Sequence, residues 1–140
     1  MPRRLSIIRI GCAAVDYLLA HDLISRSARM GEYFLKALKI PDKHQFVGDV
    51  RGRGLFAGIE FVQDKKTKEP FDPKRKLNAG IGNRAFEKGL ITYPGGRSAD
   101  GIRGDHILLA PPLIITQEQI DERVRILDQT FTEVEREIAK

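Results

Sequence analysis

Hydrophobic residues recur with helical spacing at the start of the chain and with the spacing of strands further on. Apolar side chains three or four positions apart predict one helix over residues 11–20 and a second one after Asp22, whose carboxylate we expect to cap it. Pro41 ends this helical stretch. The stripe of the second helix runs through Leu23, Ser27, Met30, Phe34, Ala37 and Leu38.

The pattern changes to alternation between Val47 and Val62, which predicts a pair of strands with one face in the core. Glycines punctuate this pair at positions 48, 52, 54 and 58, and they indicate a bulge or the close approach of another backbone or a ligand. Residues 64–73 are polar and contain two prolines, so we expect an exposed loop there.

A third helix is predicted over residues 74–89, with Leu77, Ile81, Ala85 and Phe86 on its apolar face and Gly89 as a left-handed cap at its end. Short strands follow at 90–93 and 106–110, joined by a turn-rich loop over 94–105. A capping box of Thr116 and Gln119 starts the last helix, whose apolar face comprises Ile120, Val124, Leu127, Phe131, Val134 and Ile138.

These elements add up to an α+β domain, in which amphipathic helices pack on a short, mainly antiparallel sheet of about three or four strands. A chain of 140 residues is the size of one domain and buries enough surface to be stable without disulfides or a metal. Its composition, 41% hydrophobic and 31% charged, is typical of a soluble globular protein and excludes the disordered and collagen-like classes. The single cysteine excludes an internal disulfide, and we expect a cytoplasmic protein.

The hydropathy and charge patterns argue against membrane and nucleic-acid partners. The longest apolar run, residues 107–115, is broken by two prolines and is shorter than the ~20 residues of a transmembrane helix. Arg9 interrupts the apolar patch near the N-terminus, which argues against a signal peptide. The net charge of +5 comes from charges of alternating sign with few aromatic residues, so a nucleic-acid module built on the RGRG string at 51–54 is the weakest interpretation of function.

No group of residues predicts a self-contained catalytic or metal centre. His21, His44 and His106 lie far apart without the spacing of metal ligands, and we expect each at the surface or in a helix cap. Cys12 lies in a helical apolar pattern, which favours a buried and inert thiol. Ser98 lacks the strand-to-helix context of a nucleophile elbow.

The loop over 94–105 carries the candidate binding residues, Arg97 and Arg103. An arginine is suited to a carboxylate ligand because its planar fork donates two parallel hydrogen bonds. On the sequence alone, two solvated loop arginines explain the pattern equally well.

The chain contains, in this order, the segments VRGRGLFAGIEFV, DKKTKEPFDP, FEKGLITYPGG and DGIRGDHILLAPPLIITQEQID. Together they resemble the C-terminal part of class III aminotransferases, which are pyridoxal-phosphate enzymes of fold type I. The earlier segment GCAAVDYLLAHDLISRSARMGEYF resembles the helix pair that leads from the large to the small domain in this family. The resemblance divides the chain into an atypical N-terminal segment, residues 1–10, and a small domain, residues 11–140.

The resemblance implies a small domain that helps to close an active site, while a large domain holds pyridoxal 5′-phosphate. In the family, the Schiff-base lysine and most cofactor contacts belong upstream of the segments present here, so the resemblance implies no catalytic residue, no bound cofactor and no metal ligand in this chain. The lysines in and beside the loop over 64–73 lack the apolar setting that lowers the pKa of an ammonium group; they are Lys65, Lys66, Lys68, Lys74 and Lys76. A truncated or frameshifted gene product would have this content.

The resemblance also bears on the substrate. Some relatives place a carboxylate-binding arginine where this chain has Leu108, whereas relatives acting on ω-amino substrates draw one from the preceding loop. The resemblance therefore implies Arg103, ahead of Arg97, as the substrate-binding residue.

We therefore predict a C-terminal fragment of a class III aminotransferase, a family that transfers an amino group from an amine or ω-amino acid to a keto acid, and we expect this chain to be inactive alone. The alternative is a non-catalytic interaction or oligomerisation module, in which an apolar face including Val15, Leu18 and Leu19 binds a second copy or a missing large domain. The expected partners are small-molecule amine and keto acid substrates and a homo-oligomer or large domain, with no nucleic acid and no membrane.

Overall fold

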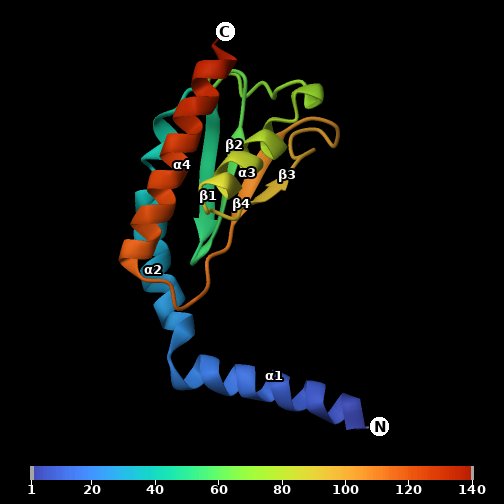
Figure 1. The fold of residues 1–140 in the computed structure, drawn as a ribbon, viewed down its shortest axis with the longest axis vertical. Helices are drawn as coiled ribbons and strands as arrows, with labels where there is room; N and C mark the ends of the chain where they lie inside the picture. The colour runs from blue at the N-terminus through green and yellow to red at the C-terminus, as the bar shows by residue number, and fades with distance from the viewer. Residues whose placement is uncertain (1, 140) are drawn as a thin grey trace.

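A computed structural model describes residues 2–139 of the chain, with their side chains from Ile7 onward. The helices and strands are, in chain order, α1 Pro2–Ala20, α2 Leu23–Ala37, β1 Val47–Arg53, β2 Phe56–Phe61, α3 Leu77–Glu87, β3 Tyr93–Gly95, β4 Asp105–Leu109 and α4 Gln117–Ile138. Two short 3₁₀ turns, η1 at Pro41–Lys43 and η2 at Pro73–Arg75, lie between them. Figure 1 shows a body made of the sheet and helices α2, α3 and α4, from which α1 projects.

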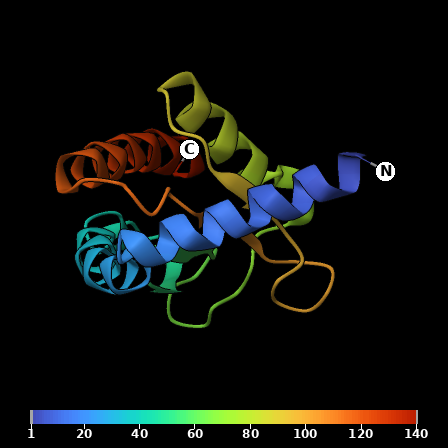
Figure 2. The same ribbon diagram turned by 90° about the horizontal axis from the view of Figure 1, so that it is seen from below.

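The strands form one antiparallel sheet in the order β1-β2-β4-β3. β1 and β2 make a hairpin, and β4 inserts between β2 and the short edge strand β3. Figure 2 shows α3 and α4 on the same side of this sheet. The α+β class and the antiparallel sheet predicted from the sequence are thereby confirmed.

The core lies between one face of the sheet and the helices. Alternate residues of a strand point to opposite faces, and on β2 only Ala57, Ile59 and Phe61 are buried. Ile107 and Leu109 of β4 lie on the same face. The helix α4 covers them with the side chains predicted for its apolar face, namely Ile120, Val124, Leu127, Phe131 and Val134.

Three phenylalanines join the sheet to α4. The ring of Phe131 lies 5.3 Å from that of Phe46 and 5.6 Å from that of Phe61, measured between centroids and with the rings edge to face. Such pairs add about 0.5–1.5 kcal/mol to the free energy of burial alone. All three rings are buried, so this cluster is the centre of the core.

Glycines allow α2 to approach the hairpin closely, as their density in this region predicted. A Cβ atom at Gly31 would lie 2.4 Å from the backbone of Gly54, which has a φ of +56° in the turn between β1 and β2. The pairing of β1 with β2 also shifts between Val47 and Asp49, so Gly48 lies at an irregularity in the register.

Two of the predicted helix ends have the expected hydrogen bonds. Gly89, with a φ of +88°, ends α3: its N–H donates to the carbonyl of Phe86 (2.9 Å), and the N–H of Leu90 donates to that of Ala85 (2.8 Å). At the start of α4, Thr116 and Gln119 cap each other through side-chain and backbone groups, as a capping box does.

The segment between β4 and α4 is tied to α2 by one arginine. Nε of Arg26 donates to the carbonyl of Leu113 (3.2 Å), and its Nη2 donates to those of Ile114 (3.3 Å) and Ile115 (2.7 Å). The guanidinium therefore satisfies carbonyls that follow the proline pair and fixes the path of the chain after β4.

Several predicted boundaries and exposures were wrong. The helix expected from residue 74 begins at Leu77, because Lys76 adopts a left-handed conformation (φ 47°) between η2 and α3. The strand expected at 90–93 begins only at Tyr93, because the backbone of Leu90 completes the end of α3. Of the predicted apolar face of α3, Ile81 and Ala85 are buried, but Phe86 lies beyond its edge and is 66% exposed.

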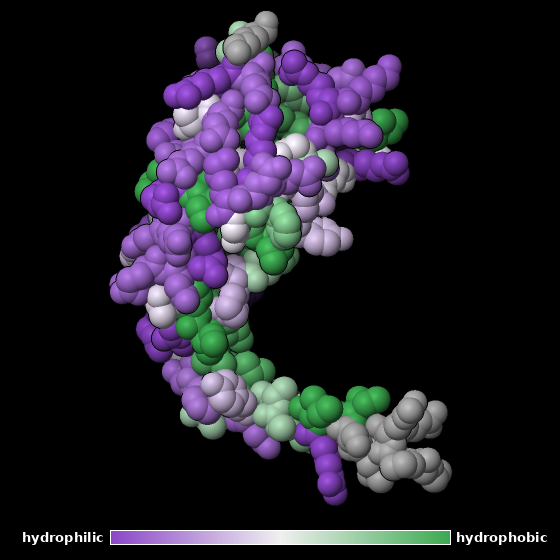
Figure 3. Space-filling view, in the orientation of Figure 1, coloured by the Kyte–Doolittle hydropathy of each residue, from purple (hydrophilic) through white to green (hydrophobic). Residues whose placement is uncertain are grey.

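The junction between α1 and α2 also differs from the expectation. Asp22 has a φ of +49° and its side chain caps nothing, so it turns the chain between the helices and pairs weakly with Arg29 (3.6 Å). α1 leaves the body at this residue, and Cys12, expected to be buried, is exposed on it. Figure 3 shows a hollow between α1 and the body. In the described part of the chain, no helix is both long and apolar enough to cross a bilayer.

Candidate functional site

The face of the sheet opposite the helices is uncovered and is the candidate functional site. Strand pairing places its residues in two rows across the sheet. One row is Arg51, Gly58, Leu108 and Tyr93, and the next is Asp49, Glu60, His106 and Gly95. The side chains are polar near β1 and apolar near β3, so the face offers both kinds of contact to a ligand.

Two adjoining hollows lie on this face. The first, of about 530 Å³, is lined by the polar side chains Arg51, Glu60, Ser98 and His106 and by the apolar side chains Phe56, Ile59 and Leu108. The second, of about 420 Å³, is lined by apolar side chains and one threonine, namely Phe56, Ile91, Thr92, Tyr93, Leu108 and Ala110. Phe56 and Leu108 line both hollows, which therefore meet at these two side chains.

Arg51 is neutralised within the face. Its Nη1 donates to Asp49 (2.5 Å) and to Glu60 (3.1 Å), and these hydrogen bonds, Asp49 first, raise the pKa of the guanidinium. These two bonds hold the guanidinium of Arg51 over the β1–β2 hairpin.

His106 lies across Gly95 of the neighbouring strand. A Cβ atom at Gly95 would be 2.3 Å from Nε2 of the imidazole, so glycine at this position leaves room for the ring as it lies here. Its Nδ1 is buried and has no hydrogen-bond partner among the described residues. A ligand or a further segment of protein would satisfy this nitrogen. No local pattern distinguishes His106 from the other histidines, because its surroundings arise from the pairing of β3 with β4.

Arg103, the first candidate for substrate binding, lies in the loop between β3 and β4 and holds two carboxylates. Nη1 donates to Glu69 (2.6 Å) and Nε donates to Asp100 (2.8 Å). Hydrogen bonds from the backbone N–H and the side chain of Arg103 lower the pKa of Asp100 to about 2, and the same two carboxylates raise the pKa of Arg103. No hydrogen bond within the described residues uses Nη2, so this end of the fork remains open.

Arg97 is exposed in the same loop, with a φ of +64° and no ion pair among the described residues. The next residues close the loop, since Ser98 N–H donates to the carbonyl of Gly104 (3.2 Å) and Ala99 N–H donates to that of Arg103 (3.0 Å). The structure thus brings Arg97 and Arg103 to one closed loop.

Asp105 anchors this loop to α3, and the sequence did not single it out. Its buried carboxylate accepts a hydrogen bond from the N–H of Leu77 (3.2 Å) at the start of α3, while Asn78 donates to the carbonyl of Gly95 (2.7 Å). Burial raises the pKa of Asp105 despite these helix-terminal N–H groups. Neither contact has a local sequence signal, because the partners are far apart in the chain.

The described residues do not form a complete catalytic or cofactor site. No lysine lines either hollow, and Lys65 and Lys68 instead donate to the carbonyls of Asp42 and Gly48 (2.5 Å each). The described residues contain no cluster of three or more His, Cys, Asp or Glu side chains that would hold a metal. The sequence resemblance implies the cofactor pyridoxal 5′-phosphate, which forms an imine with a lysine. No lysine lines the two hollows, so their residues do not fit this cofactor.

His44 is buried and both of its ring nitrogens are hydrogen-bonded, contrary to the expectation of an exposed or capping position. It is only 4% exposed, and its ring nitrogens contact Glu135 (Nδ1, 2.8 Å) and Asp128 (Nε2, 3.0 Å), both on α4. The arrangement fastens the segment before β1 to α4 and lies within the core side of the fold, so its role is structural.

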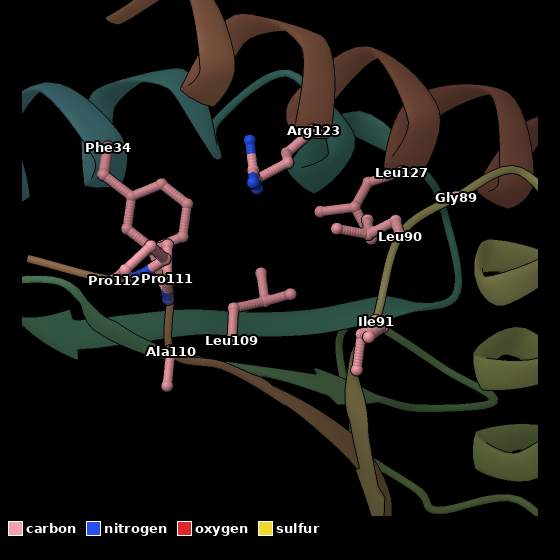
Figure 4. A pocket seen from close by; sticks show the side chains of 10 residues that line it. All are labelled: Phe34, Gly89, Leu90, Ile91, Leu109, Ala110, Pro111, Pro112, Arg123 and Leu127. Atoms are coloured by element: carbon pink, nitrogen blue, oxygen red, sulfur yellow. The ribbon is translucent and has the colours of Figure 1, made fainter. Parts of the chain in front are cut away.

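A further pocket, of about 260 Å³, lies on the helix side of the sheet (Figure 4). Phe34 of α2 and Leu127 of α4 point into it, and the guanidinium of Arg123 lies between them. Nη1 of Arg123 donates to the carbonyl of Gln119 one turn earlier (2.9 Å). None of the predicted site residues lines this pocket.

Comparison with known proteins is consistent with this geometry. Residues 6–131 match the family described as aminotransferase class-III. The aminotransferase C1771.03c of Schizosaccharomyces pombe is 48% identical over 128 residues, and the taurine–pyruvate aminotransferase of Bilophila wadsworthia is 38% identical over 126 residues. Each alignment covers 88% of this chain but only 28% and 26% of the respective relative. The crystal structure of a transaminase from the marine bacterium Virgibacillus superposes with a TM-score of 0.83 at 28% identity, over 91% of this chain and 28% of that one.

Proposed function

Since the chain belongs to the class III aminotransferase family, we propose that it acts as the C-terminal small domain of a transaminase. Its uncovered sheet face closes over an active site whose cofactor and lysine are supplied by other polypeptide. The substrates are a small amine or ω-amino acid and a keto acid. We place this reaction in the cytoplasm, and we propose the division at residue 10 between the N-terminal segment and the domain.

The observation that carries this proposal is the pairing of an uncovered sheet face with a closed arginine loop at its edge. Leu108 at the centre of the face is apolar and holds no anion. Arg103 is the nearest candidate in sequence with a free guanidinium nitrogen, and its Nη2 is available to a carboxylate without breaking the bond to Glu69. We propose that Arg103 binds the carboxylate of the substrate and that Arg97 supports it by charge.

We further propose that the chain alone is inactive and binds no pyridoxal phosphate. The cofactor supplies an electron sink for the carbanion formed on the substrate, and that chemistry needs an amine and an acidic partner for the ring. The described residues of this chain contribute instead a wall that excludes water and a cation that orients a carboxylate.

The test is complementation. The full chain is co-expressed with the remainder of the S. pombe relative, and transamination of pyruvate by an amine is measured with pyridoxal phosphate present. We expect activity from the mixture and none from either part, with R103Q in the mixture as the matched control. Activity or cofactor absorbance from the chain alone would refute its inactivity, and a stable mixture without activity would refute the proposed role.

A second function, as an interaction or oligomerisation module, is favoured by a different observation. α1 projects from the body with large apolar side chains exposed, including Ile8, Val15 and Leu19. Exposed apolar groups of this extent favour association in water.

A further inference from the structure

The pocket of about 260 Å³ on the helix side of the sheet has an apolar floor that belongs to the core. Four side chains from different parts of the chain form this floor, each at most 5% exposed, namely Phe34, Leu90, Leu109 and Leu127. Figure 4 shows them arranged around the pocket. Pro111 and Pro112 also line it, and proline has no N–H to offer a ligand. The body of a bound molecule would therefore meet almost only apolar surface.

Among the described residues that line this pocket, Arg123 alone is charged. Its side chain leaves α4 and brings the guanidinium between Phe34 and Leu127 (Figure 4). Nη1 donates to the carbonyl of Gln119. A guanidinium has five N–H donors, and within the described residues this one makes no other hydrogen bond and no ion pair. Most of the fork is therefore available to a ligand.

The helix that carries Arg123 gives it no acidic neighbour. Side chains three and four positions apart on a helix lie side by side, and around Arg123 these are Gln119, Ile120, Ile126 and Leu127. None of the four is acidic. Arg125, only two positions further on, has three acidic residues at the same spacings, namely Asp121, Glu122 and Asp128. The positive charge of Arg123 is thus left for a partner from outside the helix.

A carboxylate is the anion that suits this pocket. Its two oxygens accept parallel hydrogen bonds from a guanidinium, and its single charge balances that of Arg123. A phosphate monoester would bring about two negative charges to a pocket with one cation. The excess charge would then lie against the apolar floor, where an unpaired charge is costly. The same apolar walls keep water away from the guanidinium, which strengthens a matched ion pair.

The size of the pocket limits the apolar part of the ligand. Its volume of about 260 Å³ equals that of about nine water molecules in the liquid, and it lies below the range of about 300–1,000 Å³ for pockets that hold drug-sized ligands. A helix of a partner protein, about 10–12 Å across with its side chains, does not fit into such a volume. The occupant is therefore a small free molecule. Exposed residues at the edge give it a way in, namely Gly89, Ile91, Ala110 and Pro112.

We propose that this pocket binds a small carboxylate with a short apolar body, of the size of phenylacetate. The carboxylate lies on the guanidinium of Arg123, and the body packs against Phe34, Leu109 and Leu127. The inference does not rest on the proposed function, because that function uses the uncovered face of the sheet and this pocket lies on the helix side.

The test is a titration of the full chain with phenylacetate, followed by NMR of the backbone amides. We expect a dissociation constant of about 1 mM or tighter, with the largest shifts at residues 89–91, 109–110 and 123–127. Phenylacetamide has the same shape without the charge, and acetate has the charge without the ring. Each should bind about tenfold more weakly or worse, because each lacks one of the two kinds of contact.

Two substitutions on α4 then test the role of the guanidinium. R123Q should weaken the binding of phenylacetate about tenfold or more, and R123K should weaken it less, because lysine keeps the charge but not the fork. R125Q is the matched control: Arg125 is exposed on the same helix and does not line the pocket, so the affinity should stay unchanged. Neither arginine is buried, so thermal unfolding should be the same in all these variants.

Three results would overturn the proposal. They are equal binding of phenylacetamide, an unchanged affinity in R123Q, and no saturation below about 20 mM phenylacetate. Shifts confined to the loop of Arg97 and Arg103 would also overturn it, because they would place the carboxylate at the proposed substrate site. That last result would leave the proposed function standing.

Discussion

Nη1 of Arg103 donates a 2.6 Å hydrogen bond to Oε1 of Glu69, although the two residues are 34 positions apart in the chain. The bond joins the loop between β3 and β4 to the polar loop that follows β2. It therefore fixes the orientation of the guanidinium that we propose as the anchor for a substrate carboxylate.

The Arg103–Glu69 pair predicts graded effects of two substitutions on the complemented enzyme. R103Q should raise the KM for the keto acid about 10–100-fold, as expected for the loss of a charge-assisted hydrogen bond. E69Q should raise this KM by a smaller factor, up to about fivefold, because the guanidinium keeps its charge but loses part of the exposed ion pair that orients it. Steady-state kinetics with pyruvate measures both. An unchanged KM in R103Q would remove Arg103 from the site.

The aromatic cluster predicts a large loss of stability on truncation. F131A removes a fully buried ring that contacts Phe46 and Phe61, and it should lower the free energy of unfolding by about 3–5 kcal/mol. Urea unfolding followed by circular dichroism measures the change. Thr132, the next residue, is half-buried, and its hydroxyl donates to the backbone carbonyl of Asp128 (2.8 Å); T132A, the comparison variant, should cost far less.

The carboxylates around His44 predict a loss of stability in acid. Burial alone would raise the pKa of Asp128, but hydrogen bonds from Lys43 and His44 outweigh it and lower that pKa. Burial would also raise the pKa of Glu135, but hydrogen bonds from His44 and from the N–H of Gln45 outweigh it and lower that pKa as well. The unfolded chain thus binds protons more tightly, so this stabilisation is present above about pH 4.5 and is lost as the pH falls through the folded-state values.

Because both carboxylates are partly exposed, each should contribute about 1 kcal/mol or less. Urea unfolding of the wild type and of D128N/E135Q between pH 6 and pH 3, a range of about 3 units around the ordinary carboxyl pKa values, measures the effect. The variant should show a flatter pH dependence. An equally steep loss in the variant would mean that other carboxylates control acid unfolding.

Removing the charge of Asp105 should leave the free energy of unfolding unchanged. Burial raises its pKa, so the ionised form is disfavoured in the folded state, and its contribution to stability improves as the pH falls through that raised value. D105N keeps an oxygen for the N–H of Leu77 and should be as stable as the wild type at neutral pH. D105A loses this cap of α3 and should cost about 1–2 kcal/mol. A larger loss in D105N than in D105A would contradict this interpretation.

Gly31 predicts a steric effect without any change of charge. An added Cβ would lie 2.4 Å from the backbone of Gly54, so G31A should push α2 away from the hairpin and cost about 1–3 kcal/mol despite the better helix propensity of alanine. G80A is the matched control, because a Cβ at Gly80 meets nothing within 4 Å and should stabilise α3 slightly. Thermal unfolding of both variants distinguishes the two effects.

The sequence predicted those features that depend on neighbours along the chain. Periodicity revealed the strand pair and the buried face of α4, and local capping chemistry revealed the ends at Gly89 and Thr116. The glycine-rich hairpin also indicated a close approach, which α2 makes at Gly31.

What the sequence missed depends on partners that are distant in the chain. His44 lies in a polar segment, and nothing local shows that α4 surrounds it with two carboxylates. Cys12 belongs to a helix whose pattern resembles a buried one, but no other described element covers it. The unpartnered nitrogen of His106 and the anchor at Asp105 arise only when β4 takes its place between β2 and β3.

Arg26 links α2 to the segment that follows β4. Its guanidinium donates to the carbonyls of Leu113, Ile114 and Ile115, which lie between β4 and α4. A displacement of α2 would therefore also displace the chain that leaves the sheet after Leu109.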